Sequence, residues 1–290
     1  MYIDMFGKKR YKIGLHIHTT RSDGRATPEQ CAKLYKEAGF DAIAFTDHWA
    51  YSGDGEVEGL KIISGCEYNV GGNDTSEGVM HIVGFGMTKN PEIQITASRQ
   101  EIIDGIKKVG GVAVLAHPAW SLNTVEDALS LEGFGAVEIY NTVSGINQSF
   151  RAYSGMFVDE LANKGVVYPI TATDDVHFYE GEDETKSYIM AECDELTTES
   201  ICDAVVNGRF YATQAPELHI KLDNGVLSVN CSPCNVIRII SNAAYCGDRV
   251  VKGEKLTEYN YNVKDFEKWL RVEVDDEDGK TAWSNIILVK

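Results

Sequence analysis

The sequence predicts an α/β protein in which a TIM-like barrel is followed by a small antiparallel β domain. Short apolar runs alternate with amphipathic stretches over the first 215 residues, which is typical of strand–helix units in a parallel sheet. Near residue 215 the pattern changes, and helical periodicity is absent beyond it. A length of 290 residues accommodates one large barrel or two domains.

Each strand–helix unit has its own local signals. Thr27 and Gln30 form a capping box around a proline, and the helix they begin is expected to end near Gly39. Apolar runs predict strands at residues 12–18, 41–46, 61–66, 79–86, 112–117, 137–140 and 166–172. Further helices are expected at about 97–109 and 149–163.

The C-terminal part of the chain favours strands alone. ELHIKL, VLSVNC, NVIRII and WLRVEV are short strand-like runs, and Asp278-Gly279 marks a hairpin turn. We therefore expect a barrel domain over residues 1–215 and a β-sandwich-like domain over 216–290. In this second part, His219 alternates with apolar neighbours and is expected to be structural. The pair Cys231 and Cys234 lacks the second cysteine pair that a structural zinc site needs.

Composition narrows the function classes. With 44 acidic against 27 basic residues the net charge is -17, which argues against a protein that binds long nucleic acid. The chain opens without an apolar signal segment, and no uncharged run reaches the roughly 18 residues of a membrane span. Seven scattered cysteines indicate reduced thiols. We expect a cytoplasmic protein that binds no membrane, and its oligomeric state stays open.

Six of the seven histidines fall at or just past the end of a predicted strand. In a parallel barrel these ends form the active face, and the H-x-H pair points both imidazoles to one side. Six imidazoles and three carboxylates exceed the about four ligands of one zinc ion. We therefore expect two or three divalent transition-metal ions, either zinc, manganese or iron, bound by His16, His18, Asp23, His48, Glu67, His81, His117, Asp175 and His177.

These motifs also resemble a known family. LHIHTTRSDG, FTDH, SGCE, AHP and TDDVH, together with His81, are similar in type and order to the motifs of the PHP family, named for polymerase and histidinol phosphatase. The resemblance spans residues 12–178. It implies a distorted (β/α)7 barrel, a trinuclear metal site and hydrolysis of phosphoesters.

The resemblance also implies roles for the ligands. Glu67 resembles the carboxylate that bridges the first and second metals, and the loop residue Asp23 stands where several relatives have histidine. The remaining positions resemble the ligands of the first metal (His16, His18 and Asp175), of the second (His81 and His117) and, beside Asp23, of the third (His48 and His177).

The function expected from this set is hydrolysis of a small phosphomonoester or nucleotide phosphate by a metal-activated water. We expect Glu67 to be essential, and Arg21 and Arg209 are candidates to bind the phosphate, although each is equally compatible with a solvated surface role. Glu138 and Asn141 follow another strand and either contact substrate or support ligands.

Three alternatives stay open. An amidase or esterase on the same metals predicts a more apolar pocket, whereas a phosphatase predicts cationic side chains facing the metals. A non-catalytic regulatory module would not need the complete ligand set. A proofreading unit attached to a polymerase is opposed by the length and acidity of the chain.

Overall fold

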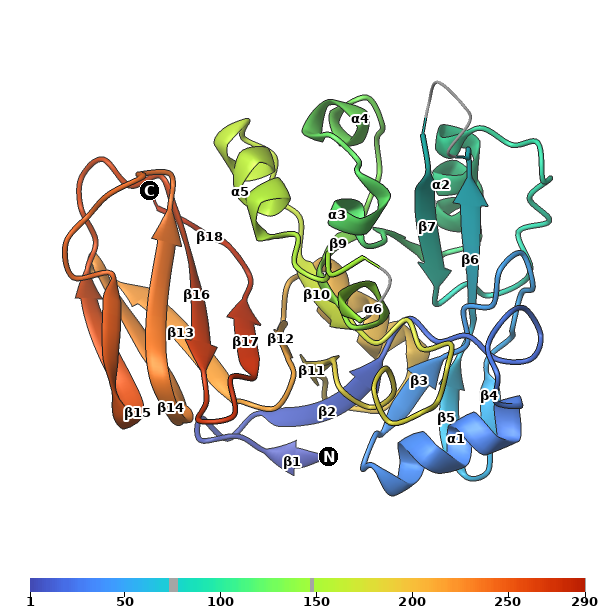
Figure 1. The fold of residues 1–290 in the computed structure, drawn as a ribbon, viewed down its shortest axis with the longest axis horizontal. Coiled ribbons are helices and arrows are strands. Elements are labelled where there is room, and N and C mark those ends of the chain that lie inside the picture. Colours follow the sequence, from blue (N-terminus) through green and yellow to red (C-terminus); the bar gives the residue numbers. More distant parts are fainter. Residues whose placement is uncertain (73–77, 147–148, 290) are drawn as a thin grey trace.

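The computed structural model of the protein describes residues 1–72, 78–146 and 149–289, and its strands form two sheets (Figure 1). The 13-stranded sheet contains β1 (Tyr2–Ile3), β2 (Lys9–Gly14), β3 (Ala42–Ala44), β4 (Gly55–Val57), β5 (Leu60–Ile63), β11 (Tyr188–Glu192), β12 (Phe210–Thr213), β13 (Leu218–Asp223), β14 (Val226–Ser241), β15 (Val250–Asn262), β16 (Trp269–Asp275), β17 (Thr281–Ser284) and β18 (Ile287–Leu288). The 5-stranded sheet contains β6 (Gly65–Val70), β7 (Met80–Phe85), β8 (Val112–Leu115), β9 (Ala136–Asn141) and β10 (Ile170–Thr173).

The helices begin at clear local signals. They are α1 (Pro28–Glu37), α2 (Arg99–Lys108), α3 (Pro118–Ser121), α4 (Val125–Leu129), α5 (Gly155–Asn163) and α6 (Thr198–Val206), with a 3-10 turn η1 (Val143–Gly145). The predicted capping box is confirmed, because the Thr27 hydroxyl accepts from the Gln30 backbone and the Gln30 side chain accepts from Thr27. Gly39, just beyond α1, has a φ of +79°, which is the left-handed conformation that glycine adopts without strain.

One helix starts later than the sequence predicts. Residues 149–154 are not helical, and α5 begins at Gly155. The cause is tertiary, since the backbone of this segment pairs with the end of β9 and the turn after it. Asn141 N donates to Ala152 O, and Arg151 N donates to Ser144 O. These contacts hold the segment as a loop.

The mixed α/β class is confirmed, but the strands do not close into one sheet. β6, β7 and β8 pair antiparallel, whereas β8, β9 and β10 pair parallel. Single bridges join the two sheets, one between Ile17 and Val176 and one between His48 and Glu67. Next to the first bridge, the backbone N–H of Ile17 donates to the Thr46 hydroxyl instead of to a backbone carbonyl of a neighbouring strand. The structure therefore differs here from the closed barrel that was expected.

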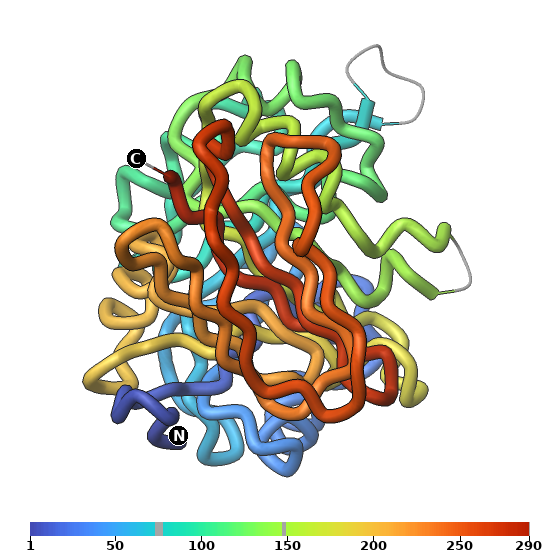
Figure 2. The backbone as a smooth tube through the Cα atoms, turned by 90° about the vertical axis from the view of Figure 1, so that its left-hand side faces the viewer, coloured from blue at the N-terminus to red at the C-terminus, as the bar shows by residue number. Residues whose placement is uncertain are grey.

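The C-terminal strands continue the larger sheet. β17 pairs with β12 across the predicted domain boundary, so β13 to β18 do not form a detached sheet. In Figure 1 they lie on the side opposite α1 and α2, and Figure 2 shows them crossing the face nearest the viewer. They still gather a hydrophobic cluster around Leu227, Ile237 and Val272. The division at residue 215 stays a prediction.

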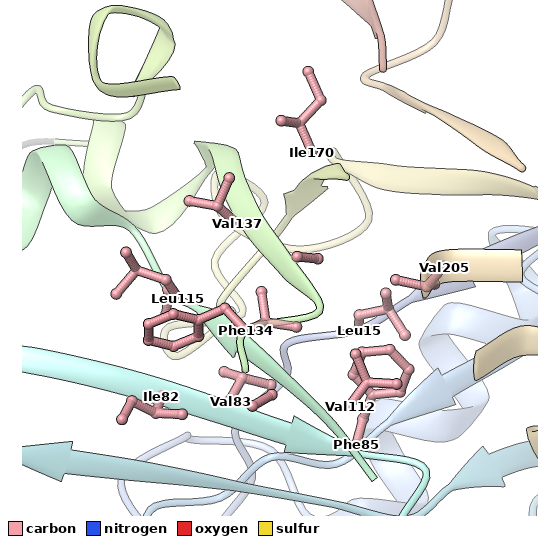
Figure 3. Close-up of a cluster of buried hydrophobic side chains, with 14 of the residues drawn as sticks. Leu15, Ile82, Val83, Phe85, Val112, Leu115, Phe134, Val137, Ile170 and Val205 are labelled. Carbon is pink, nitrogen blue, oxygen red and sulfur yellow. The ribbon is translucent and has the colours of Figure 1, made fainter. Parts of the chain in front are cut away.

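The main hydrophobic core packs α2 and α6 against the sheets. Its buried side chains include Leu15, Phe85, Val112 and Ile170 (Figure 3). Burial of this apolar surface is the dominant stabilising contribution, and it anchors the strands whose ends carry the polar residues described next. Within the three described ranges, no helix has the length and apolar character needed to cross a bilayer.

Candidate metal centre

All nine predicted ligand residues converge at one place in the fold. The strands bring eight of them there in pairs or singly, because each of these residues lies in a strand or within four residues of its end, and the ninth, Asp23, lies in a loop. His16 and His18 follow β2, and Asp175 and His177 follow β10. The other five come from the loop after β2 (Asp23), the end of β3 (His48), β6 (Glu67), β7 (His81) and the end of β8 (His117).

Glu67 lies at the centre of the cluster and is 1% exposed. Between them, its two carboxylate oxygens face imidazole nitrogens of five different histidines. Oε2 lies 3.0 Å from His18 Nε2, 3.1 Å from His48 Nδ1 and 3.3 Å from His16 Nε2. Oε1 lies 3.0 Å from His81 Nδ1 and 3.4 Å from His117 Nε2. One carboxylate thus reaches ligands on both sides of the cluster, as a bridging carboxylate must.

Asp175 is the second buried carboxylate of the set. Its Oδ1 lies 3.1 Å from the Nε2 atoms of both His16 and His18. The backbone φ of Asp175 is +52° and that of His117 is +26°, a region that residues other than glycine rarely adopt. Strain of this kind persists only where the surroundings impose it and is concentrated at functional sites.

Asp23 belongs to a more open group at the mouth of the cluster. Its side chain is 56% exposed, and its carboxylate lies 3.4 Å from His177 Nε2 and 3.7 Å from His48 Nε2. Ser22 links this loop to the protein interior, because its hydroxyl lies 3.0 Å from carboxylate oxygens of both Asp23 and the buried Asp47 and can donate to either. Three sets of side chains could therefore hold a cation: His18, Asp23, His48 and His177; His16, His18, Glu67 and Asp175; and His48, Glu67 and His81.

The donor atoms fit divalent transition-metal ions. His48 Nδ1, Glu67 Oε2 and Asp175 Oδ1 are buried without a hydrogen-bond partner. The Nε2 atoms of His16 and His18 lie 3.2 Å apart and face the same carboxylates. Buried polar atoms without partners are costly, and ions at these positions would satisfy them. The nitrogen and oxygen ligands suit zinc, manganese or iron.

The charged groups of the cluster and their burial shift the pKa values of its side chains even without ions. Burial opposes protonation of His18, but the nearby Asp175 and Glu67 carboxylates outweigh it and raise the pKa of His18 to about 9. Burial is the largest effect on His48 and lowers its pKa to about 4. Burial disfavours the charged form of Glu67, yet His16 and His81 hold its pKa well below the ordinary value. Protons and metal ions therefore compete for the same lone pairs.

Glu138 and Asn141 support the ligands from behind. The Glu138 carboxylate is 1% exposed and accepts from His16 Nδ1 at 2.8 Å and from the backbone of His117 at 2.9 Å. Asn141 donates to Glu138 at 2.9 Å and to Asp175 at 3.1 Å. A carboxylate on the far nitrogen of a ligand histidine orients the ring and increases its basicity. Glu138 and Asn141 therefore hold the ligand side chains in position.

Two acidic residues next to the predicted ligands support the surrounding backbone. Asp47 accepts from the Thr19 backbone and from the hydroxyls of Thr19 and Ser22. Asp174 accepts from the Tyr35 hydroxyl at 2.6 Å, and its burial raises its pKa to about 6. Both carboxylates therefore bind groups of the surrounding segments.

A cavity of about 400 Å³ opens onto the cluster. Besides seven of the predicted ligands, with Asp23 at the mouth, its lining consists of Trp120, Val143, Ser144 and Phe178. Phe178 follows His177 directly in the sequence, and that position alone could have suggested that it lines the cavity. Val143 and Ser144 reach the cavity because the loop after β9 folds back, which no local signal reveals.

Neither predicted arginine lines this cavity. The Arg21 guanidinium donates to the Ser52 hydroxyl at 3.0 Å and lies over the Phe45 ring. Arg209 pairs with Asp203 and lines a different cavity. Among the described residues, the lining of the metal-site cavity includes neither lysine nor arginine. The structure therefore does not bring Arg21 or Arg209 together with the nine ligand candidates.

Comparisons with known proteins agree with the ligand pattern. A model of the PHP domain family matches residues 14–151. The uncharacterized protein MJ1587 of Methanocaldococcus jannaschii is 32% identical over 119 residues, which cover 37% of this chain and 67% of that protein. A crystal structure from Bacteroides vulgatus, of a two-domain protein containing a predicted PHP-like metal-dependent phosphoesterase, is 16% identical and superposes with a TM-score of 0.56 over 99% of this chain and 96% of that one.

That structural likeness shows a shared fold over nearly the whole chain. The matched family segment contains the first seven of the nine clustered residues in sequence order, from His16 to His117. Asp175 and His177 lie beyond the matched segment but join the same cluster in space. The chain belongs to the PHP domain family.

Proposed function

We propose that this protein is a metal-dependent hydrolase of small phosphomonoesters, including nucleotide monophosphates, that uses two or three divalent ions. The observation that carries the proposal is the convergence of nine ligand-type side chains around the single carboxylate of Glu67. Membership of the PHP family supports it. In the barrel expected for this family, β2, β3 and β6 to β10 would form the ring, interrupted where single bridges replace ladders.

Bound divalent ions would supply Lewis acidity and lower the pKa of a coordinated water. The protein's own groups provide the geometry for that chemistry. Glu67 would hold the inner ions at a fixed spacing, while Asp175 and the H-x-H pair fix one of them. Asp23, His48 and His177 line the cavity on its solvent side, where a phosphoryl group would arrive. Trp120 and Phe178 would flank the leaving group and restrict water.

Charge also favours a compact phosphorylated substrate. Three divalent ions would outweigh the three carboxylates of the ligand set and make the cavity floor positive. The rest of the surface is acidic, with a net charge of -17, and would repel an extended polyanion. We therefore propose a small dianion, and not long nucleic acid, as the substrate.

An amidase or esterase is the second candidate, because one observation favours it. The described residues that line the cavity include Trp120, Val143 and Phe178 but no lysine or arginine. A neutral ester would need no cationic side chain. Since the ions themselves would provide positive charge for a phosphate, we place this alternative second.

A substrate panel separates the two candidates. Protein purified without chelators and reconstituted with Zn²⁺, Mn²⁺ or Fe²⁺ would be assayed with nucleoside monophosphates, p-nitrophenyl phosphate and p-nitrophenyl acetate. Release of inorganic phosphate at a higher kcat/KM than acetate hydrolysis supports the proposal. Faster turnover of neutral esters or amides than of every phosphoester would move the assignment to the second candidate.

A further inference from the structure

A second cavity lies where the N-terminal segment meets the C-terminal strands. Its volume is about 510 Å³, against about 400 Å³ for the metal-site cavity. Its walls come from residues 4–10, the start of β12, β13 and residues 284–287. Figures 1 and 2 show the C-terminal strands next to the N-terminal segment. The volume falls in the range of small-molecule sites, which often occur at such junctions. No described residue lines both cavities.

The interior of this cavity is apolar and aromatic. Phe210, Tyr211 and Leu218 are buried in its wall. Phe6 and Tyr211 each meet the His219 ring edge to face at 5.4 Å, so three rings form a continuous surface. Phe6 remains 55% exposed. An apolar ligand body placed here would remove that phenyl ring from water, which favours binding.

The polar part of the lining is cationic. Lys8, Arg10, Arg209 and Lys221 line the cavity with only two acidic side chains, Asp4 and Glu192. The whole chain has the opposite balance, 27 basic against 44 acidic residues. The lining itself therefore has more cationic than acidic side chains. Lys8 and Arg10 pair with the two acidic side chains of the lining, whereas Arg209 and Lys221 pair with Asp203 and Asp223 outside it, so an anion that entered the cavity would compete with those outer carboxylates for Arg209 and Lys221.

The four cations differ in how firmly they are held. Arg10 is 9% exposed and is fixed by Asp4 at 2.8 Å and Glu192 at 3.4 Å. Lys221 makes only a loose pair with Asp223 at 3.6 Å, and both side chains are largely exposed. Exposed pairs of this kind contribute little. Lys221 and Arg209, whose partner Asp203 lies outside the lining, can therefore turn toward a bound anion.

We propose that this cavity binds a small amphipathic anion, with an aromatic or aliphatic body and a single carboxylate or phosphate-type head group. The body would lie against Phe6, Tyr211 and Leu218, and the head group would lie between Arg209 and Lys221. Such a site is separate from the metal cluster and stands whether or not the protein is a phosphomonoesterase.

Isothermal titration calorimetry on the full-length, metal-loaded protein tests this proposal. The probes are 1-naphthaleneacetate, 1-naphthylmethylphosphonate, which has no ester bond to hydrolyse, and the neutral 2-(1-naphthyl)ethanol. At least one anion should bind saturably and about tenfold more tightly than the alcohol. The tighter of the two anions identifies the preferred head group.

Charge reversal locates the binding. Lys221→Glu and Arg209→Glu should each weaken binding of the anion by about fivefold or more, whereas Lys252→Glu, on exposed β15, should not change it. Thermal melts would verify that each variant is folded. Glu67→Gln should also leave binding unchanged, because that residue belongs to the metal cluster.

Any of three results with the anions and the charge-reversal variants would overturn the proposal, and a fourth would come from Glu67→Gln. The first three are the lack of saturable binding of either anion at millimolar concentration, equal affinity for the anions and the alcohol, and unchanged affinity in both charge-reversal variants. Loss of binding in Glu67→Gln would mean that the probe occupies the metal site, which also overturns it.

Discussion

Replacing Glu67 with glutamine tests how the metal cluster works. The substitution preserves the shape of the side chain but removes the charge that faces five histidines within 3.4 Å. An amide cannot neutralise two neighbouring cations as a carboxylate does. We expect kcat to fall by about 10²-fold or more, equivalent to about 2.7 kcal/mol of lost transition-state stabilisation.

Metal content should fall with activity in this variant. Two of the three candidate sets contain Glu67, so at least one ion per chain should be lost. The measurements are steady-state kinetics and elemental analysis on the same preparation, and circular dichroism verifies the fold. Glu160→Gln, at an exposed position of α5, is the matched control. Near-parental turnover with full metal content in Glu67→Gln would refute the reasoning.

Three further predictions follow from the surroundings of the cluster. Glu138→Gln should weaken metal affinity by about 10- to 100-fold, because the buried carboxylate orients His16. Competition with a chelating dye measures the affinity, and an unchanged value would exclude that supporting role. The melting temperature of the metal-free protein should fall by a few degrees as pH rises from about 6.5 to 9. The reason is that the pKa of His18 is raised to about 9, so the stabilising positive charge of that ring is lost over this pH range. Metal-loaded protein should lack this loss, and identical pH profiles for both forms would count against competition between protons and metal. Arg21→Ala should change KM by less than about twofold, since this guanidinium bonds Ser52 outside the cavity lining; a tenfold rise would instead support the phosphate-binding role predicted from sequence.

The ligand cluster was predictable because its signals are local. His16 and His18 are two apart just after β2, as Asp175 and His177 are just after β10, and the period of two in extended chain places such pairs on one face. The capping box of α1 was predictable for the same reason. In each case, the pattern and the contact lie within a few residues of each other.

Other features depend on contacts between distant segments. The run at 79–86 reads like the runs of the parallel strands, yet the strand it forms, β7, pairs antiparallel with β6 and β8, because sequence periodicity does not report strand direction. The run at 61–66 was predicted as one strand but divides between β5 and the start of β6. The helical turn predicted before Gly155 was replaced by loop contacts to β9. Arg209 lies directly before β12, and its side chain lines the second cavity and not the metal site.

The wall of the metal-site cavity was also hidden from the sequence. Val143 and Ser144 line it because Arg151 N donates to Ser144 O and draws the loop after β9 back on itself. The absence of lysine and arginine from the described lining could not be seen before the loops were placed. This composition is what keeps an ester or amide substrate as the second candidate.

The central claim is that nine side chains around Glu67 bind two or three divalent metal ions. Its most direct test is elemental analysis of the wild-type protein, purified without chelators, supplemented with Zn²⁺, Mn²⁺ or Fe²⁺ and then desalted. The protein should then contain two to three equivalents of transition metal per chain, removable by chelation. Less than one equivalent after supplementation with each metal would contradict it.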